Sequence, residues 1–247
     1  MMDIKSILNN KIPEHIAIIL DGNGRWAKKR FLPRMMGHRS GAKNLEKVTK
    51  YCSELGIKCL TVYAFSTENW NRPSEEVEYL MNYPVRYIKR KIDKLVNSNV
   101  KINFIGRKDR FPIQTLEAIN EAEMKTQNNN GLKLNIAFDY GSKNEIITAT
   151  KEIVKEVLEN KISVDDIDEK LFENHLFTKG DPKLDLLIRT SGELRISNFM
   201  LWQLSYAELY FADCYWPDFD KDELLKAIES FQKRKRRFGG LDKEDVK

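Results

Sequence analysis

The segment "DGNGRW" (residues 21–26) places an aspartate, two glycines and an arginine directly after the apolar run 15–20. Backbone N–H groups at Gly22 and Gly24 can approach a phosphate closely, and Arg25 can donate charge-assisted hydrogen bonds to it. The Asp21 carboxylate would repel such an anion unless a divalent cation lay between them. The segment therefore predicts a diphosphate site at which Asp21 binds magnesium, with a loop or helix cap as the alternative role for Asp21.

The same residues also match the dinucleotide-binding pattern G-x-G-x-x-A, which would indicate a nucleotide-dependent oxidoreductase. Three features oppose that interpretation. Arg25 and Trp26 are bulky where the helix should pack closely, and the acid expected about 20 residues later is absent from the end of the second predicted strand. Asp21 itself would also lie beside the pyrophosphate. The diphosphate and metal interpretation is therefore favoured.

The chain has 247 residues, of which 41% are hydrophobic, so it can bury a sizeable core. No linker-like segment divides it, and we expect one domain over residues 1–247, with a lead-in over 1–12 and a tail over 241–247. The 42 Lys and Arg residues exceed the 37 Asp and Glu residues by only five. This mild excess suits small anions as well as nucleic acid. Because the motif favours diphosphates, we expect no nucleic-acid partner.

The three cysteines, Cys52, Cys59 and Cys214, form no CxxC pair, which argues against a disulfide framework or a zinc site. Residues 1–15 lack the apolar core of a signal peptide, and no apolar run approaches the roughly 18 residues that span a bilayer. We therefore expect a soluble cytoplasmic protein, which can still contact a membrane peripherally.

Six short apolar runs recur along the chain and read as strands buried on both faces. Segments with helical periodicity separate most of them, which predicts parallel strands with helices on both sides. The expected fold class is α/β, with a single central parallel sheet of about six strands surrounded by helices. The predicted strands cover residues 15–20, 59–65, 100–106, 132–138, 184–189 and 207–212.

Two predicted helices carry further information. The last helix should begin after Asp220, which can cap it together with Glu223, and close before Gly239 and Gly240. The acidic run 165–169 should cap a helix start rather than bind metal. The helix that follows the second strand carries an apolar stripe. That stripe consists of Val77, Leu80, Met81, Val85, Ile88, Ile92, Leu95 and Val96.

Five motifs in order, "DGNGRWAKKR", "GHRSG", "AFSTENWNRP", "LIRTSGELRISNFMLWQLSYAELYF" and "RRFGG", closely resemble the cis-prenyltransferase family. The resemblance runs from about residue 13 to residue 240. It implies a homodimer whose sheet and helices enclose an apolar tunnel. The implied reaction is repeated magnesium-dependent condensation of isopentenyl diphosphate onto an allylic diphosphate primer, expected to be farnesyl diphosphate. The implied product is a long-chain polyprenyl diphosphate, expected to be undecaprenyl diphosphate as a lipid carrier for cell-wall synthesis.

The resemblance assigns roles to matching residues of this chain. Asp21 would bind magnesium and assist departure of the allylic diphosphate. Trp26 would form one wall of the site. The allylic diphosphate would be held by Gly22, Asn23, Gly24, Arg25, Arg34 and His38. Because the helix after the second strand begins at the active-site edge, directly after "ENWNRP", we expect its apolar stripe from Val77 to Ile92 to line the product tunnel as well as the core, with packing on the sheet alone as the alternative.

The motif after the second strand would face the same edge of the sheet, with substrate-binding roles for Ser66, Thr67, Glu68, Trp70 and Arg72. The family gives the Asn69 position a proton-acceptor role. Because a neutral amide is a poor base, we expect Asn69 to orient the isopentenyl group or a water while a diphosphate oxygen takes the proton.

Arg189, Arg195 and Ser197 would clamp isopentenyl diphosphate, since two guanidiniums and a hydroxyl suit multidentate phosphate recognition. Glu208 matches the second metal-binding carboxylate of the family and would act within one chain or across the dimer. An ion pair with a neighbouring arginine is the alternative role for Glu208.

Two departures from the family pattern stand out: "DYGSK" (139–143) replaces the common "NYGGR", and Phe31 occupies a position where glycine is frequent. A non-catalytic subunit of a heteromeric prenyltransferase is the alternative function within the family. Such subunits lose the aspartate motif after the first strand, whereas residues 21–25 are intact here. We therefore expect an enzyme.

Overall fold

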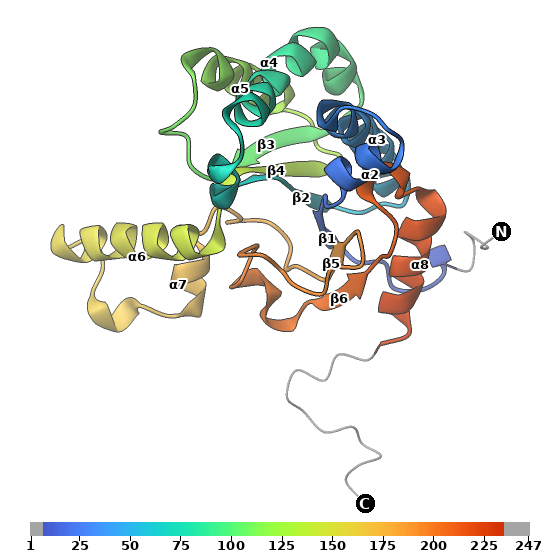
Figure 1. Ribbon diagram of the computed structural model, residues 1–247. Coiled ribbons are helices and arrows are strands. Elements are labelled where there is room, and N and C mark those ends of the chain that lie inside the picture. Colours follow the sequence, from blue (N-terminus) through green and yellow to red (C-terminus); the bar gives the residue numbers. More distant parts are fainter. Residues whose placement is uncertain (1–6, 235–247) are drawn as a thin grey trace, which may run out of the picture.

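The computed structural model describes residues 7–234, and a six-stranded sheet lies at its centre (Figure 1). Every strand pair is parallel, in the order β3-β4-β2-β1-β5-β6. This confirms the predicted α/β fold with a single parallel sheet. The strands are β1 (His15–Ile19), β2 (Cys59–Ser66), β3 (Lys101–Ile105), β4 (Lys133–Tyr140), β5 (Leu186–Arg189) and β6 (Glu208–Phe211).

Helices connect the strands, as the alternating periodicity predicts. Between β1 and β2 lie α2 (Asn23–Lys29) and α3 (Arg34–Glu54), while α4 (Ser74–Asn97) and α5 (Ile113–Thr126) precede β3 and β4 respectively. In Figure 1, α3, α4 and α5 lie together above the sheet, and α6 (Ser142–Leu158) with α7 (Glu169–Glu173) projects to the left. The last helix is α8 (Lys221–Gln232). Short 3₁₀ turns are η1 (Thr67–Asn71), η2 (Val164–Asp166), η3 (Gln203–Tyr206) and η4 (Trp216–Asp218).

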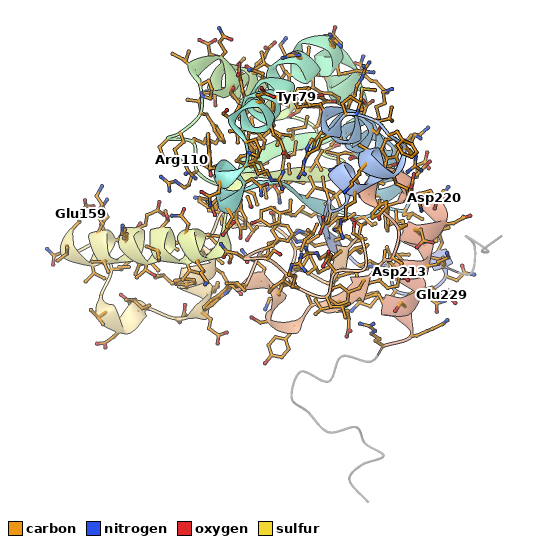
Figure 2. The ribbon with its side chains drawn as sticks, viewed as in Figure 1. Tyr79, Arg110, Glu159, Asp213, Asp220 and Glu229 are labelled. Carbon is orange, nitrogen blue, oxygen red and sulfur yellow. The ribbon has the colours of Figure 1, made fainter. Side chains whose placement is uncertain are left out.

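The predicted Asp220 cap is present, whereas the Glu223 side chain pairs with Lys226 instead of reaching back to the cap. The backbone N–H of Glu223 donates to Asp220 Oδ1 over 3.0 Å at the start of α8, where Figure 2 labels Asp220. Ser163 caps η2 and Asp168 caps α7, so the acidic run 165–169 serves helix starts as expected. Gly239 and Gly240, before which the last helix was expected to close, lie outside the described residues.

The two faces of the sheet bury alternate residues of each strand. In β1, Ile16 and Ile18 join the large core cluster beneath α3, α4, α5 and α8, while Ala17 and Ile19 join a smaller cluster on the other face. All five residues of β1 are buried, which is why the strand reads as a continuous apolar run. None of the helices described within residues 7–234 is long and apolar enough to cross a bilayer.

The strand order changes direction at β1. The chain places β2, β4 and β3 on one side of this strand, then returns to place β5 and β6 on the other. Ile19 pairs with Arg189, so the segments that follow β1 and β5 leave the sheet side by side. In open parallel sheets such a reversal point leaves a crevice at the carboxyl ends of the strands, where ligands bind. The fold thus brings the "DGNGRW" and "RTSGELR" segments together.

A buried asparagine fixes α3 beside this crevice. The Asn44 side chain donates to the backbone carbonyls of Trp216 (2.7 Å) and Phe219 (2.8 Å), and the Trp216 indole donates to the carbonyl of Gly41 over 2.8 Å. Because buried carbonyls without partners are costly, these bonds hold α3 at one position against η4. The same hydrogen bonds therefore position the start of α3, which carries Arg34 and His38.

His15, at the start of β1, is buried between two acceptors on neighbouring segments. Its Nδ1 lies 2.9 Å from the Pro182 carbonyl and its Nε2 lies 2.7 Å from Thr61 Oγ1. Burial lowers the pKa of His15 below its ordinary value of 6.5, and it outweighs the opposing effects of the Pro182 carbonyl and of Asp181 and Asp185. The imidazole is therefore neutral in the folded protein at pH 7.

We predict that His15→Gln flattens the loss of stability on mild acidification. Below about pH 6.5 the unfolded chain binds a proton that folded His15 refuses, so wild-type stability falls until the lowered folded pKa is passed. His38, whose pKa is also lowered, contributes a slope that the variant retains. Urea unfolding midpoints between about pH 7.5 and 5 measure the effect.

His175 supplies a matched control of opposite sign. The hydrogen bond to the Leu171 carbonyl raises the pKa of His175, so its proton stabilises the fold at low pH and is lost as pH rises. His175→Gln should steepen the acid loss slightly. Parallel pH curves for wild type and His15→Gln would show that His15 does not resist protonation.

Candidate diphosphate site

Asp21 lies just beyond the carboxyl end of β1 and accepts hydrogen bonds on both oxygens. Its Oδ1 accepts from the Gly22 backbone (2.6 Å) and from Arg25 (3.1 Å), and its Oδ2 accepts from Arg189 (2.8 Å). Burial alone would raise the pKa of the Asp21 carboxyl, but Arg189 and Arg25 together hold it below its ordinary value. Asp21 is thus ionised over the whole neutral range.

Arg189, the last residue of β5, is the most deeply buried cation of the site, with only 4% of its side chain exposed. Besides Asp21, it donates to the Ser197 hydroxyl over 2.8 Å and to the backbone carbonyl of Arg195. Its Nε has no hydrogen-bond partner among the described residues. Asn23 Oδ1 and Ser191 Oγ nearby are also buried without a partner within residues 7–234. Polar atoms left in this state indicate a site that a polar ligand completes.

Gly22 permits the close approach between the "DGNGRW" and "RTSGELR" segments. It forms the N-cap of α2 with φ 97°, in the left-handed region that side chains rarely adopt. A β-carbon at this position would also overlap the Ser191 hydroxyl. The residues that follow, Asn23 and Gly24, begin α2, whose first turn contains no acid. A helix start of this kind offers free backbone N–H groups to an anion.

An unexpected acid joins the start of α3 to the end of η1. The Glu76 side chain, 9% exposed at the start of α4, pairs with Arg34 Nε (2.9 Å), His38 Nε2 (3.1 Å) and Arg72 NH1 (3.0 Å). Three residues predicted to bind substrate therefore share one carboxylate. Sequence reasoning missed Glu76, because the adjacent acids Glu75 and Glu76 read as ordinary first-turn charges.

His38 is neutral near pH 7 in this cluster. Burial, the largest effect, lowers its pKa, while the hydrogen bond and charge of Glu76 raise it, and Arg72 and Arg34 lower it again. The pKa lies below its ordinary value of 6.5 as a result. With Nε2–H donating to Glu76, Nδ1 is left as the basic ring nitrogen.

The η1 turn after β2 carries the second predicted cluster. Asn69 Oδ1 accepts from the backbone N–H of Ser66 over 3.1 Å as part of a capping box, and both residues line the cavity described below. Glu68 accepts from Asn198 over 2.8 Å. Thr67, Glu68 and Trp70 are not among the cavity-lining residues, whereas Arg72 is.

Trp70 instead anchors η1 to the end of β4. Its indole donates to buried Asp139 over 2.8 Å, and Arg110, labelled in Figure 2, pairs with the same carboxylate at 2.5 Å and lies 4.8 Å from the Trp70 ring centre. Asp139 is the aspartate of "DYGSK", where the family commonly has asparagine. Arg110 neutralises the charge that this departure introduces.

A second missed acid links Arg25 and Arg195, two arginines predicted to bind diphosphates. Glu193 pairs with Arg25 at 2.7 Å and with Arg195 at 2.5 Å, and these arginine side chains are 44% and 61% exposed. Arg195 therefore lies at the open side of the site, above buried Arg189. Glu193 lies within the segment "RTSGELR" beside arginines, just as Asp21 lies beside Arg25 in "DGNGRW". This similarity in the sequence could have identified Glu193 as a site residue.

Two predicted site residues lie away from this cluster. The Trp26 indole donates to Asp218 over 2.6 Å and Arg30 covers its ring, and Trp26 is not among the cavity-lining residues. Glu208 is the first residue of β6, in register with Leu186 at the start of β5, so it lies at the amino edge of the sheet. Arg234 pairs with Glu208 at 2.8 Å. Within one chain, Glu208 and Asp21 belong to opposite edges.

A cavity of about 680 Å³ begins among the site residues and continues between α3, α4 and the sheet. Asp21, His38 and Arg189 line its polar end. Its apolar part is lined by Leu45, Leu80, Ile88, Ile102, Phe104, Leu134, Ile136 and Phe138. Lys91 and Lys94 of α4 pair with Glu46 of α3, at 3.8 and 3.2 Å, along its flank.

The structure divides the apolar stripe on α4 between the cavity and the core. Among the stripe residues whose side chains the structure describes, Leu80 and Ile88 line this cavity, together with Tyr83, Pro84 and Tyr87 of the same helix. Val77, Met81, Val85 and Ile92 pack in the core. An apolar stripe with steps of three and four covers two adjacent helix faces, and only the rotation of α4 decides which one meets the cavity.

The donor chemistry of the site fits a magnesium ion bound partly by substrate. Among residues 7–234 there is no group of three or more His, Cys, Asp or Glu side chains able to hold a metal. Magnesium, however, needs only one or two protein carboxylates when phosphate oxygens supply other ligands. Asp21, ionised and 26% exposed beside Arg25 and Arg189, could serve as such a carboxylate.

Comparison with known proteins agrees with this chemistry. A family model described as "Putative undecaprenyl diphosphate synthase" matches residues 19–239. The "Isoprenyl transferase" of Bacillus anthracis is 50% identical over 238 residues, which cover 96% of this chain and 92% of the relative. That of Listeria monocytogenes is 51% identical over 244 residues and covers 96% of each chain.

Solved structures share the fold. Lavandulyl diphosphate synthase from Lavandula x intermedia, crystallised with dimethylallyl diphosphate, superposes with a TM-score of 0.89 at 40% identity, covering 92% of this chain and 98% of that one. A "probable undecaprenyl diphosphate synthase" from Campylobacter jejuni has a TM-score of 0.75 at 33% identity, covering 93% and 99%.

We predict that Glu76→Gln lowers the pKa of His38 further. The charge and hydrogen bond of Glu76 stabilise the imidazolium, and their loss leaves burial and the two arginines to act alone. Histidine C–H resonances followed by NMR against pH measure the change. Glu75→Gln, one residue away and exposed, is the matched control and should leave the titration unchanged. An unaltered His38 pKa in Glu76→Gln would contradict the contact.

Proposed function

This chain belongs to the undecaprenyl diphosphate synthase family and is a prenyl transferase, and on that premise we propose that it extends an allylic diphosphate by repeated cis condensation with isopentenyl diphosphate. The primer is farnesyl diphosphate, and the product is a long-chain polyprenyl diphosphate, undecaprenyl diphosphate, for use as a lipid carrier in cell-wall synthesis. One observation carries the proposal: the Asp21–Arg189 pair lines the polar end of a cavity that continues between apolar side chains of α3, α4 and the sheet.

The arginines and other polar groups of the site suit two diphosphates. The α2 start with Arg25, and the α3 start with Arg34 and His38, would hold the allylic diphosphate. Arg189 with Ser197, and Arg195 beside them, would hold isopentenyl diphosphate. Because Asp21 contacts both Arg25 and Arg189, it lies between the two groups. This arrangement would bring the reacting carbons of two substrates together.

Asp21 would hold the magnesium ion, with diphosphate oxygens as further ligands. When bound, magnesium would neutralise charge on the departing diphosphate. The arginines around Asp21 would stabilise the same charge, since preorganised cations act strongly where water is excluded. Glu208 could join such a site only from a second copy of the chain, because it lies at the opposite edge of the sheet.

Asn69 would position the isopentenyl group rather than remove a proton from it. Its amide oxygen is held by the Ser66 backbone N–H, which fixes the side chain at the cavity wall. A neutral amide does not accept a proton at neutral pH, whereas a diphosphate oxygen can. We therefore assign the orientation of the isopentenyl group to Asn69 and the proton to the released diphosphate.

A second copy of the chain is the proposed partner. The projecting α6 exposes Ile147 (52%), Val154 (50%) and Leu158 (77%), and Val164 (66%) follows it. Apolar side chains at steps of seven and four lie along one helix face. Water-exposed apolar stripes of this kind mark protein interfaces. A homodimer formed through α6 would cover it.

We predict that the purified protein incorporates labelled isopentenyl diphosphate into chromatographically sized products, given magnesium and an allylic primer. Asp21→Ala should lower turnover on the order of 100-fold or more, because one transition-state electrostatic contact is lost. Asp218→Asn is the matched control, since this acid binds Arg30 and Trp26 outside the cavity, and it should retain turnover. Near wild-type turnover of Asp21→Ala at saturating substrates would remove the proposed role of Asp21.

A further prediction concerns product length. Ile88 lies on the cavity wall of α4, so Ile88→Phe should shorten the products while leaving the first condensation intact. Ile88→Val enlarges the same space and should leave the products unchanged or lengthen them. Product sizes and thermal melting measured together separate a shorter cavity from a damaged core. Identical product distributions in both variants would show that the growing chain does not follow this cavity.

A further inference from the structure

The turn between α2 and α3 exposes an apolar cluster. Phe31 has 97% of its surface exposed, and it is followed by Leu32 (39%), Met35 (45%) and Met36 (39%). We refer to these four residues as the apolar knuckle. Exposed large hydrophobic groups gathered on one short segment are unusual on a soluble surface and indicate an interaction site.

Phe31 occupies a backbone position that favours glycine. Its N–H donates to the Lys28 carbonyl (3.1 Å), and the Leu32 N–H donates to the Ala27 carbonyl (3.0 Å), which is the Schellman pattern at the end of α2. Phe31 adopts φ 56° there, in the left-handed region. Phenylalanine thus costs backbone energy at this position, and with almost all of its ring in water it gains no burial within the chain.

Cations surround the knuckle. The segment between Asp21 and Glu46 contains no acid, but it contains Arg25, Lys28, Lys29, Arg30, Arg34, Arg39 and Lys43. Arg25, Arg30 and Arg34 are paired with acids of other segments. The other four cations, Lys28, Lys29, Arg39 and Lys43, are exposed, and within residues 7–234 they form no ion pair.

The free cations and the apolar groups share one surface. Met35, Arg39 and Lys43 follow at steps of four along α3, so they lie on one side of the helix. Lys28 and Lys29 end α2, directly before the turn that carries Phe31. The result is an apolar projection flanked by lysine and arginine on both helices.

This surface adjoins the mouth of the main cavity. A shallow hollow beside the knuckle is lined by Gly24, Lys28, Phe31, Leu32 and Arg34. Gly24 and Arg34 also line the polar end of the main cavity. The polar end of the main cavity therefore lies next to the knuckle.

We propose that the apolar knuckle, with Lys28, Lys29, Arg39 and Lys43, docks the protein on a bilayer that contains anionic lipids. The phenylalanine and methionines insert among the acyl chains near the headgroups, and the cations contact the phosphates. Docking faces the cavity mouth toward the membrane, where a polyprenyl product is soluble. This last consequence rests on the proposed function, whereas the docking itself does not.

The charge distribution favours a lipid surface over a second copy of the chain. A symmetric contact between two knuckles would place lysines against lysines, which repel each other. An anionic bilayer satisfies the apolar and the cationic groups at the same time. Long lysine and arginine side chains can extend from a buried stem to the headgroups.

Co-sedimentation with vesicles tests the proposal without any substrate. Wild type should bind vesicles of equimolar phosphatidylglycerol and phosphatidylcholine, release in high salt, and bind pure phosphatidylcholine weakly. Lys28→Gln/Lys29→Gln should weaken binding about 30-fold, at about 1 kcal/mol for each lysine near an anionic surface. Phe31→Gly should weaken it about 10-fold or more through lost apolar insertion.

Phe31→Gly also separates docking from folding, because glycine suits the φ of this position and should leave the melting temperature unchanged or higher. Two matched controls should bind as wild type: Met124→Ser removes an apolar side chain that is 61% exposed on α5, and Lys101→Gln/Lys151→Gln removes two exposed lysines elsewhere.

Three results would overturn the proposal: failure of wild type to bind the anionic vesicles, equal binding by the knuckle variants and their controls, or a changed primer KM in Phe31→Gly with vesicle binding intact. The last result would place Phe31 in the substrate site. Because the assay contains no substrate, vesicle binding by an inactive enzyme would overturn the proposed function and support the docking surface.

Discussion

The ion pair between Asp21 and Arg189 is the interaction on which the site depends. Arg189 is almost fully buried at the end of β5, and a buried guanidinium without a counter-charge would be strongly destabilising. Asp21 supplies that charge from the end of β1, the neighbouring strand. The pair therefore joins the two motifs across the point where the strand order reverses. Asp21 also stays ionised there, because the two neighbouring arginines hold its pKa below the ordinary value.

Two further acids also pair with buried or clustered basic side chains of the site. Glu76 gathers Arg34, His38 and Arg72, and Glu193 joins Arg25 to Arg195. A site built to bind diphosphates contains many cations, which repel one another when no ligand is bound. Carboxylates placed among them lower that repulsion and hold each side chain in position. Under the proposed function, an arriving diphosphate would compete with these acids for their arginines, so affinity would be balanced against the stability of the free protein.

The cavity shows how one sheet face serves two purposes. Alternate residues of β3 and β4 face the helices, and some of them, such as Phe104 and Leu134, belong to the core while also lining the cavity. The helix α4 likewise divides its apolar stripe between close packing and open space. The cavity is thus a region of the core left unfilled between α3 and α4. Its length depends on a few side chains at this boundary.

The sequence alone determined the features that rest on local periodicity and local chemistry. The apolar runs located all six parallel strands, the glycines and Asp21 indicated a diphosphate loop, and Asp220 marked the start of α8. Only the tertiary structure decided which distant charges meet: Glu76 with His38, Glu193 with two arginines, and Glu208 at the edge opposite Asp21. The physical reason is that strand order and helix rotation are set by packing of the whole chain. Neighbouring residues such as Glu75 and Glu76 therefore look equivalent until that packing buries one and exposes the other.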